Sequence, residues 1–315
     1  MVNSQTGPGG AKPGAASASS VLDPAVIDHI SSLTLVAQTV VEGFMSGQHR
    51  SPQKGSSVEF AQHREYVHGD QLRHIDWQIF ARSDRLVVKE FVEETNFSCH
   101  LLLDSSESMA FTSHKWTKFD YARWCVSSLA YLIIRQRDAA GLATFDSKLQ
   151  NFLPPTNGSH QMHTILAQLE ATEPNGETGI VDALQDISSK MSRRGIVAIF
   201  SDFFVDIEAL GSGLKRLRHA GHEPILFQVL DPQELEFDFD QLRRLDGLEG
   251  LGNIKVDPKE IRQAYREEIQ KHQAELQNLV RELGCDFVPL TTKDSLAVTL
   301  STYLARRSAR ARLKS

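Results

Sequence analysis

Cysteine is scarce in this chain, and long apolar runs are missing. Cys99, Cys125 and Cys285 stand far apart with no Cys-x-x-Cys pair, which argues against a disulfide framework or a structural zinc site and favours reduced thiols. Apolar stretches such as Ile196–Phe200 hold about five residues, whereas a membrane-spanning helix needs about 20. The first twenty residues lack the apolar core of a secretory signal. We therefore expect a soluble, cytoplasmic protein without a membrane span.

The chain also lacks an excess of positive charge. The chain has 34 Lys and Arg against 40 Asp and Glu, a formal net charge of −6, so we expect no nucleic-acid partner. No P-loop, Gly-x-Gly-x-x-Gly or Gly-x-Ser-x-Gly sequence occurs, which removes the sequence support for nucleotide hydrolysis and for esterase chemistry. A short basic tail, residues 306–315, is interpreted as the solvated end of a closing helix.

The composition divides the chain into four parts. Residues 1–20 contain four Gly, four Ala, four Ser and two Pro, a composition that cannot form a core and predicts a disordered leader. Residues 21–96 hold an expected helix and a polar, β-rich segment. From residue 97 to 305, short apolar strands alternate with amphipathic helices, the pattern of a parallel sheet covered on both faces. We predict an α/β fold: a doubly wound, mainly parallel sheet preceded by an N-terminal helix and a β-rich segment.

Two of the predicted strands end in an acid. Leu101-Leu102-Leu103 runs into Asp104, and Ile196–Phe200 runs through Ser201 into Asp202. Ligands of open α/β sheets bind outside the carboxyl ends of the strands, where hard oxygen donors suit Mg²⁺. A strand-end Asp or a Ser before a helix is also a common cap, so only the full set is specific. The candidate metal ligands are Asp104, Ser106, Ser108, Thr178 and Asp202.

The order of these residues resembles the metal-ion-dependent adhesion site of von Willebrand factor A domains. Asp104-x-Ser106-x-Ser108-Met follows an apolar strand, and Thr178 and Asp202 come from later loops. The resemblance implies that all five residues hold Mg²⁺ or Mn²⁺, with one open position that an acidic residue of a partner protein fills. It implies binding rather than catalysis.

A second string precedes the predicted sheet. Tyr-x-x-Gly-Asp-x-x-Arg-x-Ile-Asp-Trp-x-x-x-Ala-Arg, beginning at Tyr66, is similar to the hallmark of bacterial domain-of-unknown-function family 58 (DUF58). That resemblance implies a chaperone-like or assembly partnership with a MoxR-type AAA+ ATPase, beside which members are commonly encoded. From pattern alone, ion pairs beneath a hairpin could form among Asp70, Arg73, Asp76 and Arg82. The signature residues, with a structural or a partner-docking role, are Tyr66, Gly69, Asp70, Arg73, Asp76, Trp77 and Arg82.

Three functions remain in competition. The first is a non-enzymatic, Mg²⁺-dependent protein-interaction module. The second is a scaffold that contacts partners through the signature segment without metal. The third is a Mg²⁺-dependent phosphatase with a strand-end Asp as nucleophile; against it, Ser106 occupies the position where haloacid-dehalogenase-like phosphatases have a second Asp.

Overall fold

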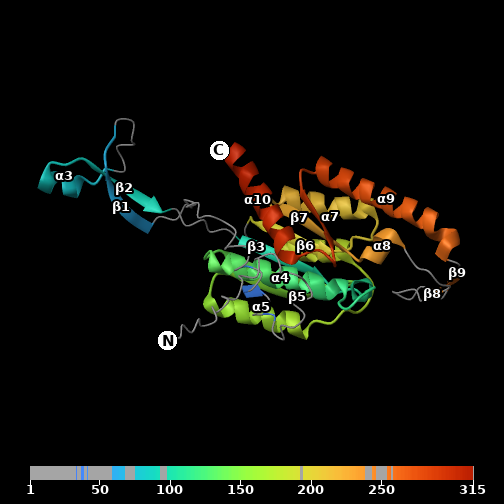
Figure 1. Cartoon of the computed structure of the whole chain (residues 1–315). Helices are drawn as coiled ribbons and strands as arrows, with labels where there is room; N and C mark the ends of the chain where they lie inside the picture. Colours follow the sequence, from blue (N-terminus) through green and yellow to red (C-terminus); the bar gives the residue numbers. More distant parts are fainter. Residues whose placement is uncertain are drawn as a thin grey trace, which may run out of the picture.

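Six strands form the central sheet of the computed structural model, in the order β10-β7-β6-β3-β4-β5 (Figure 1). All neighbours are parallel except β5, which pairs antiparallel with β4 at one edge. The strands are β3 (Ser98–Asp104), β4 (Ala139–Phe145), β5 (Leu149–Thr156), β6 (Ile196–Ser201), β7 (Glu223–Leu230) and β10 (Asp286–Thr291). The predicted doubly wound, mainly parallel sheet is confirmed.

The structure describes most of the chain from residue 98 onward and parts of what precedes it. The described residues are 33, 37–38, 41, 59–67, 75–92, 98–191, 194–237, 243–245, 254–256 and 258–314. The predicted leader, residues 1–20, and the signature residues Gly69, Asp70 and Arg73 lie outside them. In the described residues, every helix is too short or too polar to span a bilayer.

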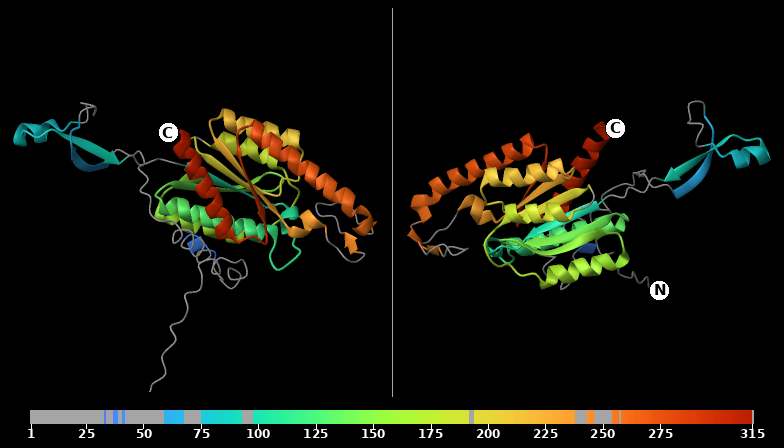
Figure 2. Two further views of the ribbon diagram at one scale, coloured as in Figure 1. Left: turned by 45° about the horizontal axis from the view of Figure 1, so that its top comes forward. Right: turned by 180° about the vertical axis from the view of Figure 1, so that it is seen from behind.

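Helices cover both faces of the sheet (Figure 2). One face carries α4 (Lys118–Arg135), α5 (Ser159–Ala171) and α10 (Leu296–Lys314), and the other carries α6 (Ile180–Lys190), α7 (Ile207–His219) and α9 (Pro258–Glu282). Side chains alternate along a strand, so β3 serves both layers. Leu101 and Leu103 belong to the core under α4, whereas Leu102 belongs to the core under α6 and α7.

The connections place a topological switch point at the centre of the sheet. From β3 the chain proceeds to β4 and then to β5 on one side, and it returns to β6 on the opposite side of β3. Adjacent loops therefore leave in opposite directions at the carboxyl ends of β3 and β6, which opens the crevice where such folds bind ligands. Asp104 and Asp202 stand at these two ends.

Smaller elements complete the fold. They are β1 (Glu59–Glu65), α3 (Trp77–Ser83) and β2 (Val87–Val92) before the sheet, η2 (Glu107–Ala110) after β3, and α8 (Pro232–Glu236), β8 (Arg243–Leu245) and β9 (Ile254–Val256) after β7. Leu33, Ala37 and Val41, in the expected N-terminal helix, are helical and buried, and Leu33 joins the core under α4.

The closing helix differs from its prediction at both ends. The sequence pattern predicts a helix from about Thr291 to Ala305, but α10 begins at Leu296 and continues to Lys314. Thr291 ends β10 instead, and the turn after it is closed by its amide, which donates to the carboxylate of Asp294. The basic tail is thus helical, and Arg307 is held by Glu223 (2.6 Å) and Asp286 (3.1 Å).

Candidate functional site

Asp104 is buried at the end of β3 with both carboxylate oxygens engaged. Its residue exposure is 0 %. Oδ1 accepts a hydrogen bond from the amide of Ser106 at 2.9 Å, and Oδ2 accepts one from the Ser201 hydroxyl at 2.6 Å. Since Ser201 ends β6, this bond ties the carboxyl ends of the two strands together at the switch point.

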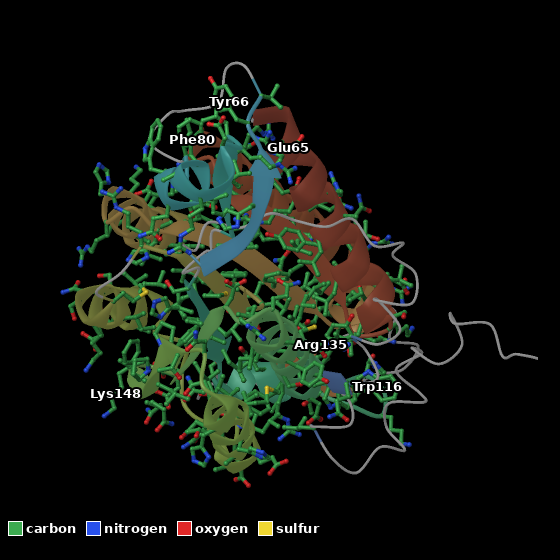
Figure 3. The ribbon with its side chains drawn as sticks, turned by 90° about the vertical axis from the view of Figure 1, so that its left-hand side faces the viewer. Glu65, Tyr66, Phe80, Trp116, Arg135 and Lys148 are labelled. Carbon is green, nitrogen blue, oxygen red and sulfur yellow. The ribbon has the colours of Figure 1, made fainter. Side chains whose placement is uncertain are left out.

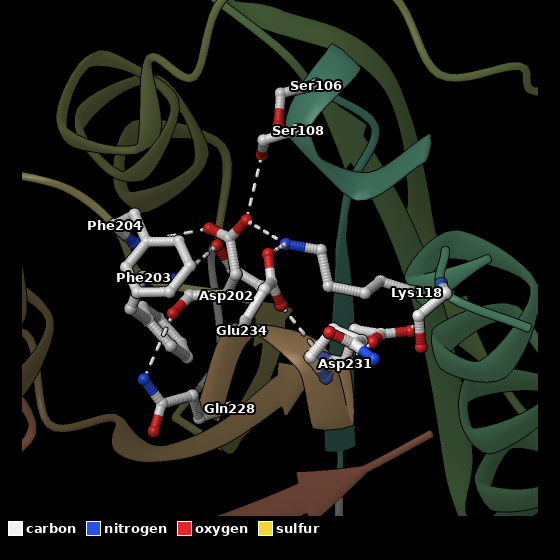
Figure 4. A network of polar contacts seen from close by, with 12 residues as sticks. Ser106, Ser108, Lys118, Asp202, Phe203, Phe204, Gln228, Asp231 and Glu234 are labelled. Carbon is white, nitrogen blue, oxygen red and sulfur yellow. Dashed lines mark hydrogen bonds and ion pairs between the residues drawn. The ribbon is translucent and has the colours of Figure 1, made fainter. Parts of the chain in front are cut away.

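A chain of hydroxyl contacts leads from Ser106 to the second acid (Figure 4). The 3₁₀ turn η2 directs the Ser108 side chain back toward the sheet, where its hydroxyl lies 3.1 Å from that of Ser106. Ser108 also donates to Asp202 Oδ2 at 2.9 Å. The structure thus joins four of the five predicted ligands, two acids and two serines, in one cluster.

Thr178 reaches the same edge of the sheet through its loop. The amide of Asn175 donates to the Ser105 carbonyl, and the amide of Glu107 donates to the Gly176 carbonyl, each at 2.8 Å. These two bonds hold the segment before α6 against the loop that follows β3. The third predicted loop is therefore adjacent to the first, and the Thr178 side chain is half-buried there.

The surroundings of Asp104 disfavour a negative charge on its carboxyl. Burial raises the pKa of the Asp104 carboxyl above its usual range, repulsion from Asp202 raises it further, and hydrogen bonds from Ser201 and Ser106 offset only part of the shift. Carboxylate and hydroxyl oxygens are the hard donors that Mg²⁺ and Mn²⁺ prefer. A divalent cation beside two buried carboxylates would relieve their repulsion, so the residues present fit such an ion.

The candidate metal ligands include only two carboxylates and no imidazole. Among the described residues, no three His, Cys, Asp or Glu side chains lie together as potential metal ligands. A cation between Asp104 and Asp202 would depend on serine and threonine hydroxyls and on water for the rest of its shell, as Mg²⁺ commonly does in proteins.

Two residues beside the site, Lys118 and Glu234, were not predicted from the sequence. Lys118, the first residue of α4, reaches Asp202 Oδ2 at 2.7 Å and Glu234 Oε1 at 2.6 Å, and its side chain is 1 % exposed. Burial alone would lower the pKa of Lys118, but the two carboxylates outweigh it and hold that pKa above its usual range. Glu234 lies in α8, far along the chain. The one available signal is a cation in the first turn of a helix, where the dipole disfavours it.

The signature segment forms a small separate unit of β1, β2 and α3. Asp76 caps α3: its Oδ1 accepts from the amides of Gln78 and Ile79, and its Oδ2 lies 3.0 Å from the His63 ring. Asp76 thus has the structural role of a helix cap. Figure 3 shows Tyr66 of this unit at one end of the molecule, well away from Trp116.

Other signature residues face solvent. Trp77 is 58 % exposed, with its ring edge-on to Phe80 at 6.1 Å, and Arg82 is exposed on the same helix. The Tyr66 amide donates to the Leu86 carbonyl at 3.0 Å, which closes the end of the hairpin.

The sheet is mainly parallel with helices on both faces, and the Asp-x-Ser-x-Ser loop lies at its switch point. This is the arrangement that the resemblance to von Willebrand factor A domains implies. The family model described as "Protein of unknown function DUF58" matches residues 62–275. The chain belongs to this family, as the signature string indicated.

Relatives found by sequence cover this chain to different extents. The uncharacterised protein Rv1480 of Mycobacterium tuberculosis is 24% identical over 293 residues, which cover 90% of each chain. The uncharacterised protein YeaD of Bacillus subtilis is 28% identical over 138 residues, covering 42% of this chain and 32% of YeaD.

Solved structures with a similar fold were also found. BatB of Bacteroides thetaiotaomicron matches with a TM-score of 0.45 and 15% identity, covering 68% of this chain and 99% of BatB. An aerotolerance-related membrane protein of Bacteroides fragilis matches with a TM-score of 0.47 and 16% identity, covering 65% of this chain and 96% of that protein. The VWA domain of SpRpn10 matches with a TM-score of 0.40 and 13% identity, covering 65% of this chain and 93% of that domain.

Proposed function

We propose that this protein is a non-enzymatic interaction module that binds an acidic residue of a partner protein through a Mg²⁺ or Mn²⁺ ion. Asp104, Ser106, Ser108, Thr178 and Asp202 would hold the ion. The observation that carries the proposal is the convergence of two buried acids from neighbouring strands with two serine hydroxyls, at the switch point of the sheet. Bound there, the ion would supply a Lewis-acidic position for a carboxylate.

Binding is favoured over phosphoryl transfer by the residues beside Asp104. Ser106 occupies the position where a haloacid-dehalogenase-like phosphatase has its second Asp, and its hydroxyl contacts that of Ser108. The one lysine at the site, Lys118, is enclosed and paired with two carboxylates, so it is not available to clamp a phosphate.

Metal binding gives the direct test. We expect Mg²⁺ to raise the melting temperature of the full chain, since a ligand that binds only the folded state stabilises it by mass action. Asp104→Ala and the more conservative Asp104→Asn should abolish this increase and the heat of Mg²⁺ binding in isothermal titration. Asp206→Asn is the matched control, because Asp206 is an exposed cap of α7 outside the site. Equal Mg²⁺ binding by Asp104→Asn and the wild type would refute the assignment.

We further propose that the partner is a MoxR-type AAA+ ATPase, in a chaperone-like or assembly role in the cytoplasm. Membership of the family supports the partner. The cytoplasmic location is supported by three unpaired cysteines, of which Cys99 and Cys125 are buried; burial raises the pKa of the Cys99 thiol to about 12 and keeps it protonated.

A metal-independent scaffold is the second candidate, and one observation favours it. Trp77, Val67 and Leu86 are large apolar residues of the signature unit, and all three are exposed. Exposed aromatic residues are enriched at contact sites between proteins. In this alternative the ATPase would dock on the signature unit, with no part for the metal.

Affinity capture separates the two candidates. We expect the wild-type chain to retain an AAA+ ATPase in Mg²⁺ and to lose it in EDTA, as judged by mass spectrometry. Asp104→Asn should lose it in either buffer, while Trp77→Ala should retain it in Mg²⁺. Retention in EDTA together with loss on Trp77→Ala would favour the scaffold instead.

A further inference from the structure

Lys118 is enclosed between two carboxylates next to the candidate metal site. Its ammonium contacts Asp202 and Glu234 and lies 5.4 Å from the centre of the Phe204 ring and 6.0 Å from that of Phe111. Figure 4 shows the lysine extending from α4 to both acids. The charge is therefore surrounded by protein on several sides, and water does not screen it.

Neither the helix nor the core gives a reason for a lysine here. A cation in the first turn of a helix opposes the helix dipole, and a buried ion pair is on average no more stabilising than apolar residues of similar volume. The cap of α4 is complete without Lys118, because Thr117 and Asp120 form a reciprocal capping box.

The lysine contacts the same Asp202 oxygen that faces the candidate metal ligands. Asp202 Oδ2 accepts the hydrogen bond of Ser108, so this oxygen faces the hydroxyl cluster, and the same oxygen accepts from Lys118 Nζ. The ammonium would thus be a second positive charge close to any cation held by that cluster, in a poorly screened region. Glu234 Oε1 accepts from the same ammonium at 2.6 Å and so offsets part of its charge.

The formal charges of this cluster match a divalent cation. With all carboxyls ionised, Asp104, Asp202 and Glu234 contribute three negative charges and Lys118 one positive charge, so these four side chains carry a net charge of −2. The buried Asp231 carboxyl beyond Glu234 lies 3.3 Å from the His114 ring and is the same in every variant below. Removing Lys118 would make the net charge of the four −3, and neutralising Glu234 would make it −1. Because unscreened charges interact strongly at short range, each step should change the affinity for a divalent ion.

We propose that Lys118 is the internal counter-ion of the metal site: it holds Asp202 in place when no metal is bound, and its charge limits the affinity for divalent cations. Glu234 anchors the lysine and offsets part of its charge. This inference rests on the proposed metal-dependent function, and it assigns to Lys118 and Glu234 a role in setting the metal concentration at which the site fills.

Isothermal titration of the metal-free full chain with MgCl₂ and MnCl₂ tests the proposal through the order of affinities. Lys118→Met should bind at least about tenfold more tightly than the wild type, and Glu234→Gln about tenfold more weakly. The double variant, which restores a net charge of −2, should fall between them. Lys215→Met removes an exposed lysine of α7 and should bind as the wild type does.

The double variant also covers the case in which Lys118→Met alone does not fold. It differs from Glu234→Gln only at position 118, and it has the same net charge as the wild type, so tighter binding than that of Glu234→Gln would support the proposal by itself. The inference is wrong, and Lys118 only positions Asp202, if the wild type binds metal but two comparisons show no gain in affinity. These are Lys118→Met against the wild type and the double variant against Glu234→Gln. If neither the wild type nor any variant binds Mg²⁺ or Mn²⁺, the proposed function fails along with it.

Discussion

We expect Gly179→Ala to lower the free energy of unfolding by about 3 kcal/mol, the upper part of the range for overpacking a closely packed site. A Cβ at position 179 would lie 2.1 Å from the carbonyl oxygen of Ser147 and 2.4 Å from its carbonyl carbon. Both atoms belong to the backbone of the turn between β4 and β5, so no side-chain rotation relieves the clash. The amide of Gly179 also donates to the Asp146 carbonyl at 2.7 Å, so the two segments cannot separate without breaking a hydrogen bond.

The same substitution should also weaken metal binding, because Thr178 is the adjacent residue and moves with Gly179. Urea unfolding followed by tryptophan fluorescence, with and without Mg²⁺, measures both effects. Gly158→Ala is the matched control: Gly158 is the N-cap residue before α5, and a Cβ there meets nothing within 4 Å. Its unfolding free energy should change by less than about 1 kcal/mol. Equal stability of the two variants would show that the turn between β4 and β5 yields easily.

Acidification should destabilise the protein through His100, a buried residue of β3 outside the metal site. The His100 ring stacks on Phe152, with centroids 6.2 Å apart, and lies edge-on to the ring of His222. Burial, with a contribution from His222, lowers the pKa of His100 from 6.5 to about 4. Burial also lowers the pKa of His222, whose Nδ1 has no hydrogen-bond partner within the described structure.

The direction of this pH effect on stability follows from proton binding in the folded and unfolded states. Between pH 6.5 and 4 the unfolded chain binds a proton at His100 that the folded chain does not, so lowering the pH favours unfolding. Above pH 6.5 both states are neutral at this residue and it contributes no pH dependence. The depression of the pKa from 6.5 to about 4 corresponds to a loss of about 3 kcal/mol by pH 4.

Urea unfolding of matched variants over pH 4 to 7 isolates this contribution from that of the carboxyl groups. His100→Leu should show a shallower loss of stability on acidification than the wild type, by about 3 kcal/mol over the range. His219→Gln, which removes an exposed histidine of α7, should follow the wild-type curve. Parallel curves for His100→Leu and the wild type would contradict the assignment of the pH effect to His100.

The sequence predicted most of the sheet domain because its signals are local. Secondary structure can be predicted from short continuous apolar runs such as Leu101–Leu103 and from apolar residues at helical spacing such as Ile180, Ala183 and Leu184. The alternation of the two patterns implies a parallel sheet. The ends of α10 were less predictable, since Thr291 extends β10 by pairing in parallel with Leu230 of β7, a contact more than 60 residues away along the chain.

The scarcity of cysteine and of long apolar runs, the chain order of strands and helices, and the residue types at the strand ends were determined by the sequence alone. Those features suffice to place Asp104 and Asp202 at one edge of a sheet. Only the tertiary structure decided that Lys118 lies between Asp202 and Glu234, because each of these contacts spans more than 80 residues of chain. No local propensity or spacing encodes such a contact: it arises from how α4, β6 and α8 pack together.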